Sequence, residues 1–426
     1  MNDCKFTKFY CYLEFIFLLL LFKELMMKIG LLKEEKVPFD KRVVLTPEQC
    51  RRVKLRYPNI DLVVQRSAFR CFSDDEYASK GIRLVDDISD CDVLLGIKEV
   101  CKASLVAGKT YFYFSHTIKK QPYNRELLRR MIQMGINMVD YEVLKDKEGK
   151  RLIGFGRYAG IVGAYNGFLT YGLKSGNYSI KSANNCKDRV EIELELRNVV
   201  LNDEKIIFTG NGRVGRGIME IMRRLDVKQV SVDQFLNEKF SRSVFLHLKT
   251  MDYNERIDGS FSDKNEFYKH PELYQSSFNK FTKSADIFIA GHYYASGSPY
   301  LFTKEDAKLD DFNLKVIADV SCDIDGPVAS TIRPSTIEDP IYGYNAETEK
   351  EVPYKQNNAI AVMAVSNLPC ELPKDASEDF GSEMLERVMP ALINGDKEQI
   401  ISNATICRDG DLMPNFEYLR DYVNGD

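Results

Sequence analysis

The feature that most constrains the fold is a glycine-rich turn near the middle of the chain, Gly210-Asn211-Gly212-Arg213-Val214-Gly215. A run of β-forming residues, 206–209, leads into this turn, and apolar residues at helical spacing follow it. A strand, a glycine turn and a helix in this order are typical of dinucleotide-binding α/β domains, where helix N–H groups stabilise a pyrophosphate. The sequence therefore predicts cofactor contacts at Gly210, Gly212, Arg213, Val214 and Gly215.

An acidic residue extends this motif. We expect a short strand at 230–232 that ends at Asp233, about 20 residues after the first glycine, where a carboxylate accepts the ribose hydroxyls of adenosine. Because a carboxylate repels the 2′-phosphate of NADP, Asp233 favours NAD as the cofactor. NADP is the alternative, since Arg213, Lys228 or Arg242 would supply a compensating cation. A competing interpretation is that Asp233 only caps a turn.

Composition limits the classes of function. A chain of 426 residues with 44% hydrophobic residues is long enough for two or three domains with cores of their own. A net charge of −4 gives no reason to expect nucleic acid as a partner. Ten cysteines without a CxxC pair, and four histidines, form neither a zinc nor a disulfide pattern. We therefore expect no metal site, and reduced thiols in the cytoplasm.

The first 26 residues form a hydrophobic extension of different character. Their apolar run, 9–22, is interrupted by Glu14 and is too short to span a bilayer, so membrane association is not expected. The run resembles the apolar part of a signal peptide, but no small-residue cleavage site follows it. A mitochondrial transit peptide is disfavoured because the first arginine is Arg42. The preferred interpretation is a start codon upstream of a true start at Met26 or Met27.

From Met27 onward, strand-like and helical segments alternate, which favours parallel sheets covered by helices. The expected helices of the first half are 47–56 and 124–134. The expected strands are 29–32, 62–65, 92–98, 110–115 and 137–142 in the first half, then 205–210, 229–233, 285–291, 315–321 and 359–365. The pattern predicts an α/β fold with two Rossmann-like, doubly wound domains and an active-site cleft between them.

We expect the domain boundaries at changes in this pattern. Residues 27–165 are predicted to form the first segment of a substrate and catalytic domain, and residues 166–325 an NAD(P)-binding Rossmann domain. Residues 326–426, with a final helix that starts near Ser377, are predicted to return to the first domain. The charged segment 174–204 is expected to be exposed.

Two expected strands end in residues suited to proton transfer. One delivers Lys98, and the next delivers His116. Ligands bind beyond the carboxyl ends of strands in open α/β sheets, and an imidazole beside a desolvated lysine can act as an acid–base pair. The competing interpretation is a solvated lysine and a structural, hydrogen-bonded histidine.

A resemblance to a known family adds to this pattern. The segments KTYFYFSHTIKKQPYNRELLRRMI (109–132) and NMVDYEVLKDKEGKRLIGFGRYAGIVGA (137–164) closely resemble the lysine-2-oxoglutarate reductase part of bifunctional aminoadipic semialdehyde synthase. They resemble less closely the fungal saccharopine dehydrogenases that form lysine. Both groups belong to the alanine dehydrogenase and transhydrogenase superfamily. The resemblance resumes at 267–278, 318–328 and 366–381.

The resemblance implies roles for individual residues. It implies that Lys98 and His116 are catalytic and that the carboxylates of Glu99 and Glu142 tune them. It further implies substrate-carboxylate binding by Arg42, Lys119 and Arg151, and cofactor contacts at the glycine loop, Asp233, Asp319 and Ser321. For Lys119 and Arg151, solvated surface charge is an equal alternative.

The implied reaction is a reductive amination that joins L-lysine and 2-oxoglutarate to give saccharopine, or its reverse, with hydride from a nicotinamide cofactor. The expected partners are these small molecules, and a homo-oligomer is left open. A related alanine- or opine-type amino-acid dehydrogenase is the first alternative, and it would need fewer cations than Lys119 and Arg151 supply. A catalytically silent nucleotide-binding regulator is the second, disfavoured by the presence of Lys98, His116 and Arg42 together.

Overall fold

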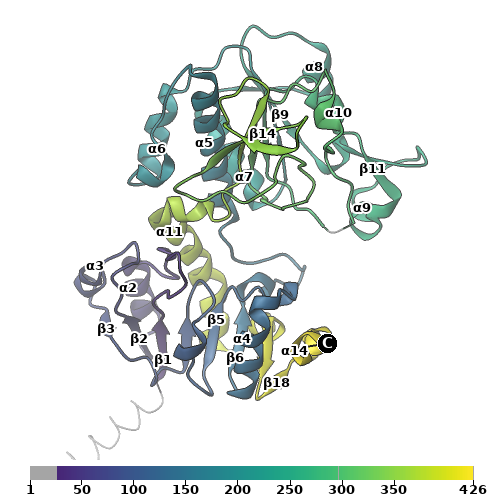
Figure 1. Cartoon of the computed structure of the whole chain (residues 1–426). Coiled ribbons are helices and arrows are strands. Elements are labelled where there is room, and N and C mark those ends of the chain that lie inside the picture. The colour runs from purple at the N-terminus through teal and green to yellow at the C-terminus, as the bar shows by residue number, and fades with distance from the viewer. Residues whose placement is uncertain (1–25, 296, 426) are drawn as a thin grey trace, which may run out of the picture. The chain divides into compact units, whose positions relative to one another are not determined.

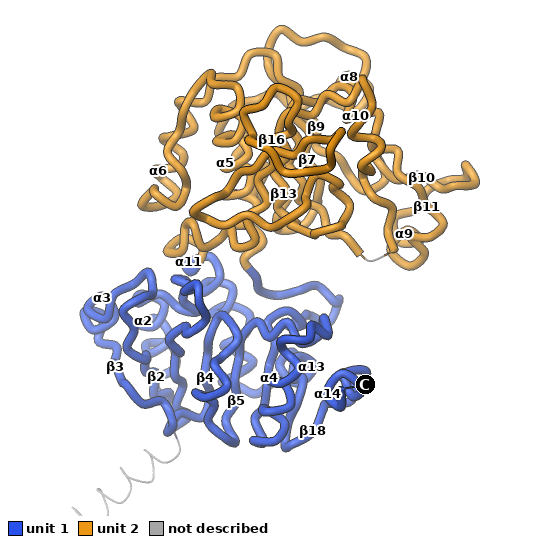
Figure 2. The backbone as a smooth tube through the Cα atoms, viewed as in Figure 1, with its two compact units in different colours: residues 1–154, 377–426 blue, residues 155–376 orange. Residues whose placement is uncertain are grey.

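The chain divides into two compact units, each built around its own eight-stranded sheet (Figure 1). A computed structural model describes residues 26–295 and 297–425. Unit 1 contains the chain up to Gly154 and again from Ser377, whereas unit 2 is the continuous stretch Phe155–Ala376 (Figure 2). The hydrophobic extension predicted at the N-terminus lies, apart from residue 26, outside the described residues.

The sheet of unit 1 is mostly parallel. Its order is β18-β17-β6-β5-β4-β1-β2-β3, and β1 to β6 run parallel to one another. The strands are β1 (Met27–Leu31), β2 (Ile60–Gln65), β3 (Arg83–Val85), β4 (Val93–Leu95), β5 (Thr110–Tyr113), β6 (Asn137–Asp140), β17 (Thr405–Arg408) and β18 (Asp411–Leu412). The C-terminal strand β17 pairs antiparallel with β6, so the end of the chain completes the sheet that its beginning started.

Local sequence signals explain the helices of unit 1. Thr46 and Gln49 form a capping box at the start of α2 (Pro47–Arg56), and Pro47 occupies its first turn. Ser73 caps α3 (Asp74–Ser79) in the same way. The remaining helices are α4 (Pro122–Gln133), α12 (Met389–Asn394), α13 (Ile400–Ala404) and α14 (Arg420–Asn424); α11 (Pro373–Glu383) contains the boundary between the units.

Unit 2 repeats the architecture with the order β15-β14-β16-β13-β12-β7-β9-β8. Its parallel strands are β7 (Lys205–Thr209), β8 (Lys228–Gln229), β9 (Val244–Leu248), β12 (Ile287–Ala290), β13 (Val316–Asp319) and β16 (Ala359–Met363). The antiparallel strands β14 (Ile341–Asn345) and β15 (Lys350–Val352) extend one edge. Outside this sheet, β10 (Asn254–Arg256) and β11 (Tyr274–Ser276) form a two-stranded ribbon. The helices are α5 (Gly156–Ser175), α6 (Arg189–Glu195), α7 (Arg213–Arg224), α8 (Val232–Asn237), α9 (Lys264–Lys269) and α10 (Asn279–Thr282).

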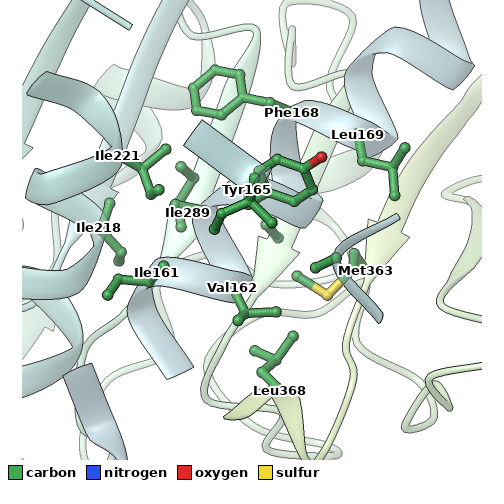
Figure 3. Packing of buried hydrophobic residues seen from close by; sticks show 14 of the residues in the cluster. Ile161, Val162, Tyr165, Phe168, Leu169, Ile218, Ile221, Ile289, Met363 and Leu368 are labelled. Atoms are coloured by element: carbon green, nitrogen blue, oxygen red, sulfur yellow. The ribbon is translucent and has the colours of Figure 1, made fainter. Parts of the chain in front are cut away.

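One hydrophobic core of unit 2 surrounds α5, which is buried along most of its length (Figure 3). Glycines bring α5 into direct backbone contact with α7. A Cβ atom on Gly160 would lie 2.0 Å from the carbonyl oxygen of Val214, and one on Gly217 would lie 2.0 Å from that of Arg157. This helix was not predicted from the sequence, because a helix buried on all sides lacks the one-sided apolar stripe that marks an amphipathic helix.

The predicted α/β class with two mostly parallel sheets is confirmed, but three details differ. The boundaries lie at 154/155 and 376/377 instead of 165/166 and 325/326, because β14 to β16 join the sheet of unit 2 and only the chain beyond Ala376 returns. The strand predicted at 230–232 is wrong, since Ser231 caps α8 there. Segment 174–204 is not simply exposed, because Ile180, Ile192 and Leu196 enter the core.

Within the described residues, no helix combines the length and the apolar character that crossing a membrane requires.

Candidate functional site

The carboxyl ends of three neighbouring parallel strands deliver the predicted catalytic residues of unit 1. The chain leaves β4 toward Lys98 and Glu99, leaves β5 toward His116, and leaves β6 toward Glu142. Because β4, β5 and β6 are adjacent and parallel, their ends meet at one edge of the sheet. The strand order thus brings together residues that lie far apart in the sequence.

Asp140, at the end of β6, connects the turns that follow β5 and β6 through hydrogen bonds. Its carboxylate accepts hydrogen bonds from the hydroxyl and the backbone N–H of Ser115 and from the backbone N–H of Glu142, the last at 2.7 Å. Burial raises the pKa of Asp140 to about 6 despite these hydrogen bonds. Next to Ser115, His116 adopts a left-handed backbone conformation with φ of 54°, which is uncommon outside glycine. The turn that presents His116 is therefore held by a buried carboxylate.

Glu142 lies near an imidazole and two cationic side chains. Its carboxylate is 3.4 Å from Nδ1 of His116 and 3.9 Å from Nζ of Lys119. Burial alone would raise the pKa of Glu142, but the contact with His116 and the positive charges of Lys119 and Arg151 together lower it. Glu142 is therefore anionic at neutral pH. The sequence predicted all four of these residues, and the structure brings them together.

Glu99 approaches the same cluster from β4. It forms an ion pair of 2.8 Å with Lys36 and accepts a long hydrogen bond of 3.5 Å from the amide of Asn124, which also donates to the carbonyl of Ser115. Burial opposes ionisation of Glu99, but the hydrogen bond from Lys36 and the charges of Lys36 and His116 lower its pKa overall. Two anionic carboxylates therefore lie near His116.

The sequence analysis did not identify Glu34, which follows β1. Its carboxylate accepts the backbone N–H groups of Ile97 and Lys98 at 2.6 and 2.9 Å, and so positions the backbone of Lys98. Part of the residue reaches the surface, but the carboxylate itself is enclosed, and burial raises the pKa of Glu34 to about 8. Glu34 is the first of two acidic residues that follow the first strand in the sequence. Its role depends on the pairing of β1 with β4, which the sequence did not predict.

Two predicted substrate-binding arginines already have protein partners. Arg42 and Asp40 form a bidentate pair with distances of 2.9 and 2.6 Å, and both side chains are buried. The guanidinium of Arg151 donates to the carbonyl of Ile153 and lies 5.4 Å from the ring centroid of Phe114. By contrast, the side chain of Lys119 is 58% exposed, so its ammonium is accessible to a ligand.

The glycine loop of unit 2 has the close packing that a dinucleotide site needs. Gly210 has a φ of 102°, and a Cβ atom there would lie 2.1 Å from the carbonyl oxygen of Gly291. A Cβ atom on Gly215 would lie 1.9 Å from the carbonyl oxygen of Gly210. In contrast, no described residue beyond the two chain neighbours lies within 4 Å of a Cβ atom on Gly212, and no side chain in the described structure caps helix α7, which begins there. The loop therefore leaves space and backbone N–H groups for an anion such as a pyrophosphate.

Two histidines beside this loop were missed as site residues. His247, at the end of β9, bonds the carbonyl of Gly210 through Nε2 at 2.9 Å and stacks on Phe208. His292, after β12, contacts the hydroxyl of Thr209 through Nδ1 at 2.8 Å, and burial lowers its pKa to about 4. Their positions follow from the order β12-β7-β9, which only the folded sheet reveals.

The remaining predicted cofactor residues lie in different surroundings. Asp233 is exposed in the first turn of α8, where its carboxylate accepts a hydrogen bond of 2.8 Å from Asn237. Asp319, at the end of β13, is fully buried and accepts hydrogen bonds from Ser321, Cys322 and Thr331. It shapes the turn that presents Ser321. In the described part of the chain, no group of three acidic, histidine or cysteine side chains is arranged to hold a metal ion.

Several known proteins are similar to this chain in sequence. Residues 30–162 match the family model "Alanine dehydrogenase/PNT, N-terminal domain". The chain is similar to the mitochondrial α-aminoadipic semialdehyde synthase of Mus musculus, with 27% identity over 92% of this chain and 47% of the mouse protein. It is also similar to the NAD(+)-dependent, L-lysine-forming saccharopine dehydrogenase of Emericella nidulans, with 24% identity over 85% of this chain and 90% of the fungal protein. The predicted resemblance is thereby confirmed.

The fold has a solved counterpart. An L-alanine dehydrogenase structure superposes with a TM-score of 0.63 at 17% identity, over 93% of this chain and all of that one. The chain spans about half the length of the semialdehyde synthases that it matches, 47% for the mouse protein. The name of that protein places it in mitochondria, so a cytoplasmic location for this chain stays a prediction.

Proposed function

We propose that this chain, whose N-terminal part is an alanine dehydrogenase/PNT N-terminal domain, is an amino-acid dehydrogenase that joins L-lysine and 2-oxoglutarate into saccharopine, or catalyses the reverse reaction. The observation that best supports the proposal is the cluster at the edge of unit 1, where His116 lies between anionic carboxylates and next to cations. Such a cluster combines proton transfer with binding of a negatively charged substrate.

In the proposed reaction, the neutral ε-amine of lysine attacks the ketone carbon of 2-oxoglutarate, forming a C–N bond and a carbinolamine. Loss of water gives an imine, and its reduction by hydride together with one proton gives the secondary amine of saccharopine. A nicotinamide dinucleotide bound to unit 2 supplies the hydride. Side chains that accept and donate protons would assist each step before reduction, because each moves a proton onto or away from nitrogen or oxygen.

His116 is suited to this proton transfer. A carboxylate can only accept a hydrogen bond, so Glu142 facing Nδ1 favours the tautomer with a proton on that atom. Nε2 is then the atom that exchanges protons with the reactants. We propose that Lys98 shares this role and that Glu99 and Glu142 adjust the charge around the pair. Lys119 and Arg151 would bind the carboxylates of the oxo acid, since both act electrostatically on Glu142 and therefore lie close to the same point.

In unit 2, we propose that Gly210 to Gly215 hold the pyrophosphate. Two features of the described residues support this fit: a Cβ atom on Gly212 would have no neighbour within 4 Å apart from the adjoining residues of the chain, and helix α7 starts without a side-chain cap. Asp319 would act indirectly through the turn at Ser321, because its carboxylate oxygens are already engaged.

The direct test is a turnover assay with the purified protein. Lysine and 2-oxoglutarate are supplied with NADH or NADPH, loss of nicotinamide absorbance is followed, and the product is identified by mass spectrometry. We expect oxidation that requires both substrates and yields saccharopine. Reactions without lysine, and with ammonia and pyruvate in place of the pair, are the controls. Turnover with ammonia and pyruvate alone would favour an alanine-type dehydrogenase, and no turnover with any pair would favour the silent regulator.

A further inference from the structure

The sequence spacing selects Asp233 for the adenosine end of the cofactor site. The order of strands in unit 2 indicates a different position for this end of the site. In doubly wound sheets, the strand that carries the glycine loop has a neighbour on each side. The adenosine ribose lies at the carboxyl end of the neighbour that belongs to the same half of the sheet as the glycine-loop strand. In this chain the strand next to β7 on that side is β9, and β8, which follows α7 in sequence, lies beyond it at the sheet edge.

The pairing registers of β9 with β7 and with β8 support the same conclusion. Thr209 pairs with Leu248, so Lys249 is level with Gly210, the first glycine of the loop. The hydrogen bond from His247 to the carbonyl of Gly210 holds the end of β9 against the loop. In contrast, the last residue of β8, Gln229, pairs with Phe245, three residues before Leu248, and the chain then turns into α8. Asp233 therefore does not follow a strand that ends beside the loop.

We propose that the adenosine ribose binds at the carboxyl end of β9 and that the ammonium of Lys249 binds the 2′-phosphate of NADP(H). This inference rests on the proposed function only in requiring a nicotinamide dinucleotide in unit 2. Lys249 is exposed, and among the described residues no carboxylate forms an ion pair with its side chain. A cation at this position is the recognition element for a 2′-phosphate, whereas a carboxylate would select the free hydroxyls of NAD(H).

The carboxylate of Asp252 lies near Lys249 in the sequence and contacts its backbone. Asp252 follows in the same turn, and its side chain accepts the backbone N–H of Lys249 at 2.6 Å. This hydrogen bond holds the turn after β9 and occupies an oxygen that would otherwise be available to ribose hydroxyls. We therefore assign Asp252 to positioning Lys249, and the choice between the two cofactors to Lys249 itself.

Binding measurements test the inference without turnover. Dissociation constants of the full chain are measured by calorimetry for NADPH, NADH, 2′,5′-ADP and 5′-AMP. We expect NADPH and 2′,5′-ADP to bind at least 10-fold more tightly than their counterparts that lack the 2′-phosphate. Lys249→Met should weaken NADPH and 2′,5′-ADP by about 10- to 100-fold, the range for a hydrogen bond to a charged group, and leave NADH unchanged. Lys228→Met and Asp233→Ser, which alter the region around β8, are matched controls and should change none of the constants.

Several outcomes would overturn the inference. These are tighter binding of NADH than of NADPH by the unmodified protein, equal weakening of both by Lys249→Met, or a loss of NADPH affinity in Lys228→Met instead. Weaker NADH binding in Asp252→Asn without any effect of Lys249→Met would assign ribose recognition to Asp252. If NADPH binds as expected but lysine and 2-oxoglutarate give no product, the proposed reaction fails while the assignment of Lys249 stands.

Discussion

Nδ1 of His116 lies 3.4 Å from the carboxylate of Glu142, although the two residues follow different strands of the unit 1 sheet. Parallel pairing of β5 with β6 places both strand ends at the same edge, and Asp140 fixes both turns through hydrogen bonds to Ser115 and Glu142. The contact is therefore a product of sheet register and not of local sequence.

For the proposed acid–base role, His116→Ala and Lys98→Met should each reduce kcat by about 10²- to 10⁴-fold, the usual contribution of general acid–base catalysis. The dissociation constant for the nicotinamide cofactor should stay nearly unchanged, because the glycine loop belongs to unit 2. Steady-state kinetics and cofactor titration of the same preparations provide both values. Turnover at the level of the unmodified protein in both variants would contradict the role.

Arg42 and Asp40 should behave as a coupled pair. Arg42→Ala should lower the free energy of unfolding by about 3 to 5 kcal/mol, because it removes the guanidinium that pairs with the buried carboxylate of Asp40. The double variant Asp40→Asn/Arg42→Met should recover most of this loss. Urea unfolding of the single and double variants measures the coupling.

The double variant also tests whether Arg42 binds substrate, because the expected recovery of its stability separates an effect on binding from an effect on folding. If Arg42 binds a carboxylate of 2-oxoglutarate, the KM for the oxo acid should rise about 100-fold, with a smaller change for lysine. Equal changes in the two KM values would identify Arg42 as a purely structural residue.

Glu34 should make stability depend on pH. Burial raises its pKa in the folded protein from 4.5 to about 8, so the folded state binds more protons than the unfolded state between these values. Its contribution to stability is therefore fully present below pH 4.5 and is lost as the pH rises toward 8. Between pH 5 and 8, Glu34→Gln should show a smaller decline in the free energy of unfolding than the unmodified protein. Parallel pH dependences in urea unfolding would refute an enclosed, protonated Glu34.

Two glycines of the nucleotide loop should respond differently to alanine. Gly215→Ala places a methyl group against the carbonyl of Gly210 and should lower the free energy of unfolding by about 1 to 3 kcal/mol. Gly212→Ala meets no protein atom, so the free energy of unfolding should change by less than about 0.5 kcal/mol. It should nevertheless weaken NADPH and NADH binding, because the methyl group occupies the space proposed for the pyrophosphate. Unchanged cofactor affinity in Gly212→Ala would place the pyrophosphate elsewhere.

The sequence by itself determined the fold class, the strand–glycine–helix unit at Gly210 and most of the secondary structure of unit 1, because these depend on local signals. Strand-like and helical segments in alternation predicted the strands, and the helix predicted at 47–56 agrees with α2. The residues at the ends of β4, β5 and β6 could also be identified, since a strand that ends in Lys98, His116 or Glu142 is visible without knowledge of its neighbours.

Only the tertiary structure decided which of these residues meet and which do not. The pairing of β1 with β4 gave Glu34 its contact with the backbone of Lys98, and burial next to Asp40 gave Arg42 its partner. Because β9 lies between β7 and β8, Asp233 does not follow a strand that neighbours β7. Lys249, which follows β9, is instead level with the first glycine of the loop. Strand order and burial are set by the packing of whole sheets, and the free energy of that packing is a property of contacts between distant segments, which spacing along the chain does not encode.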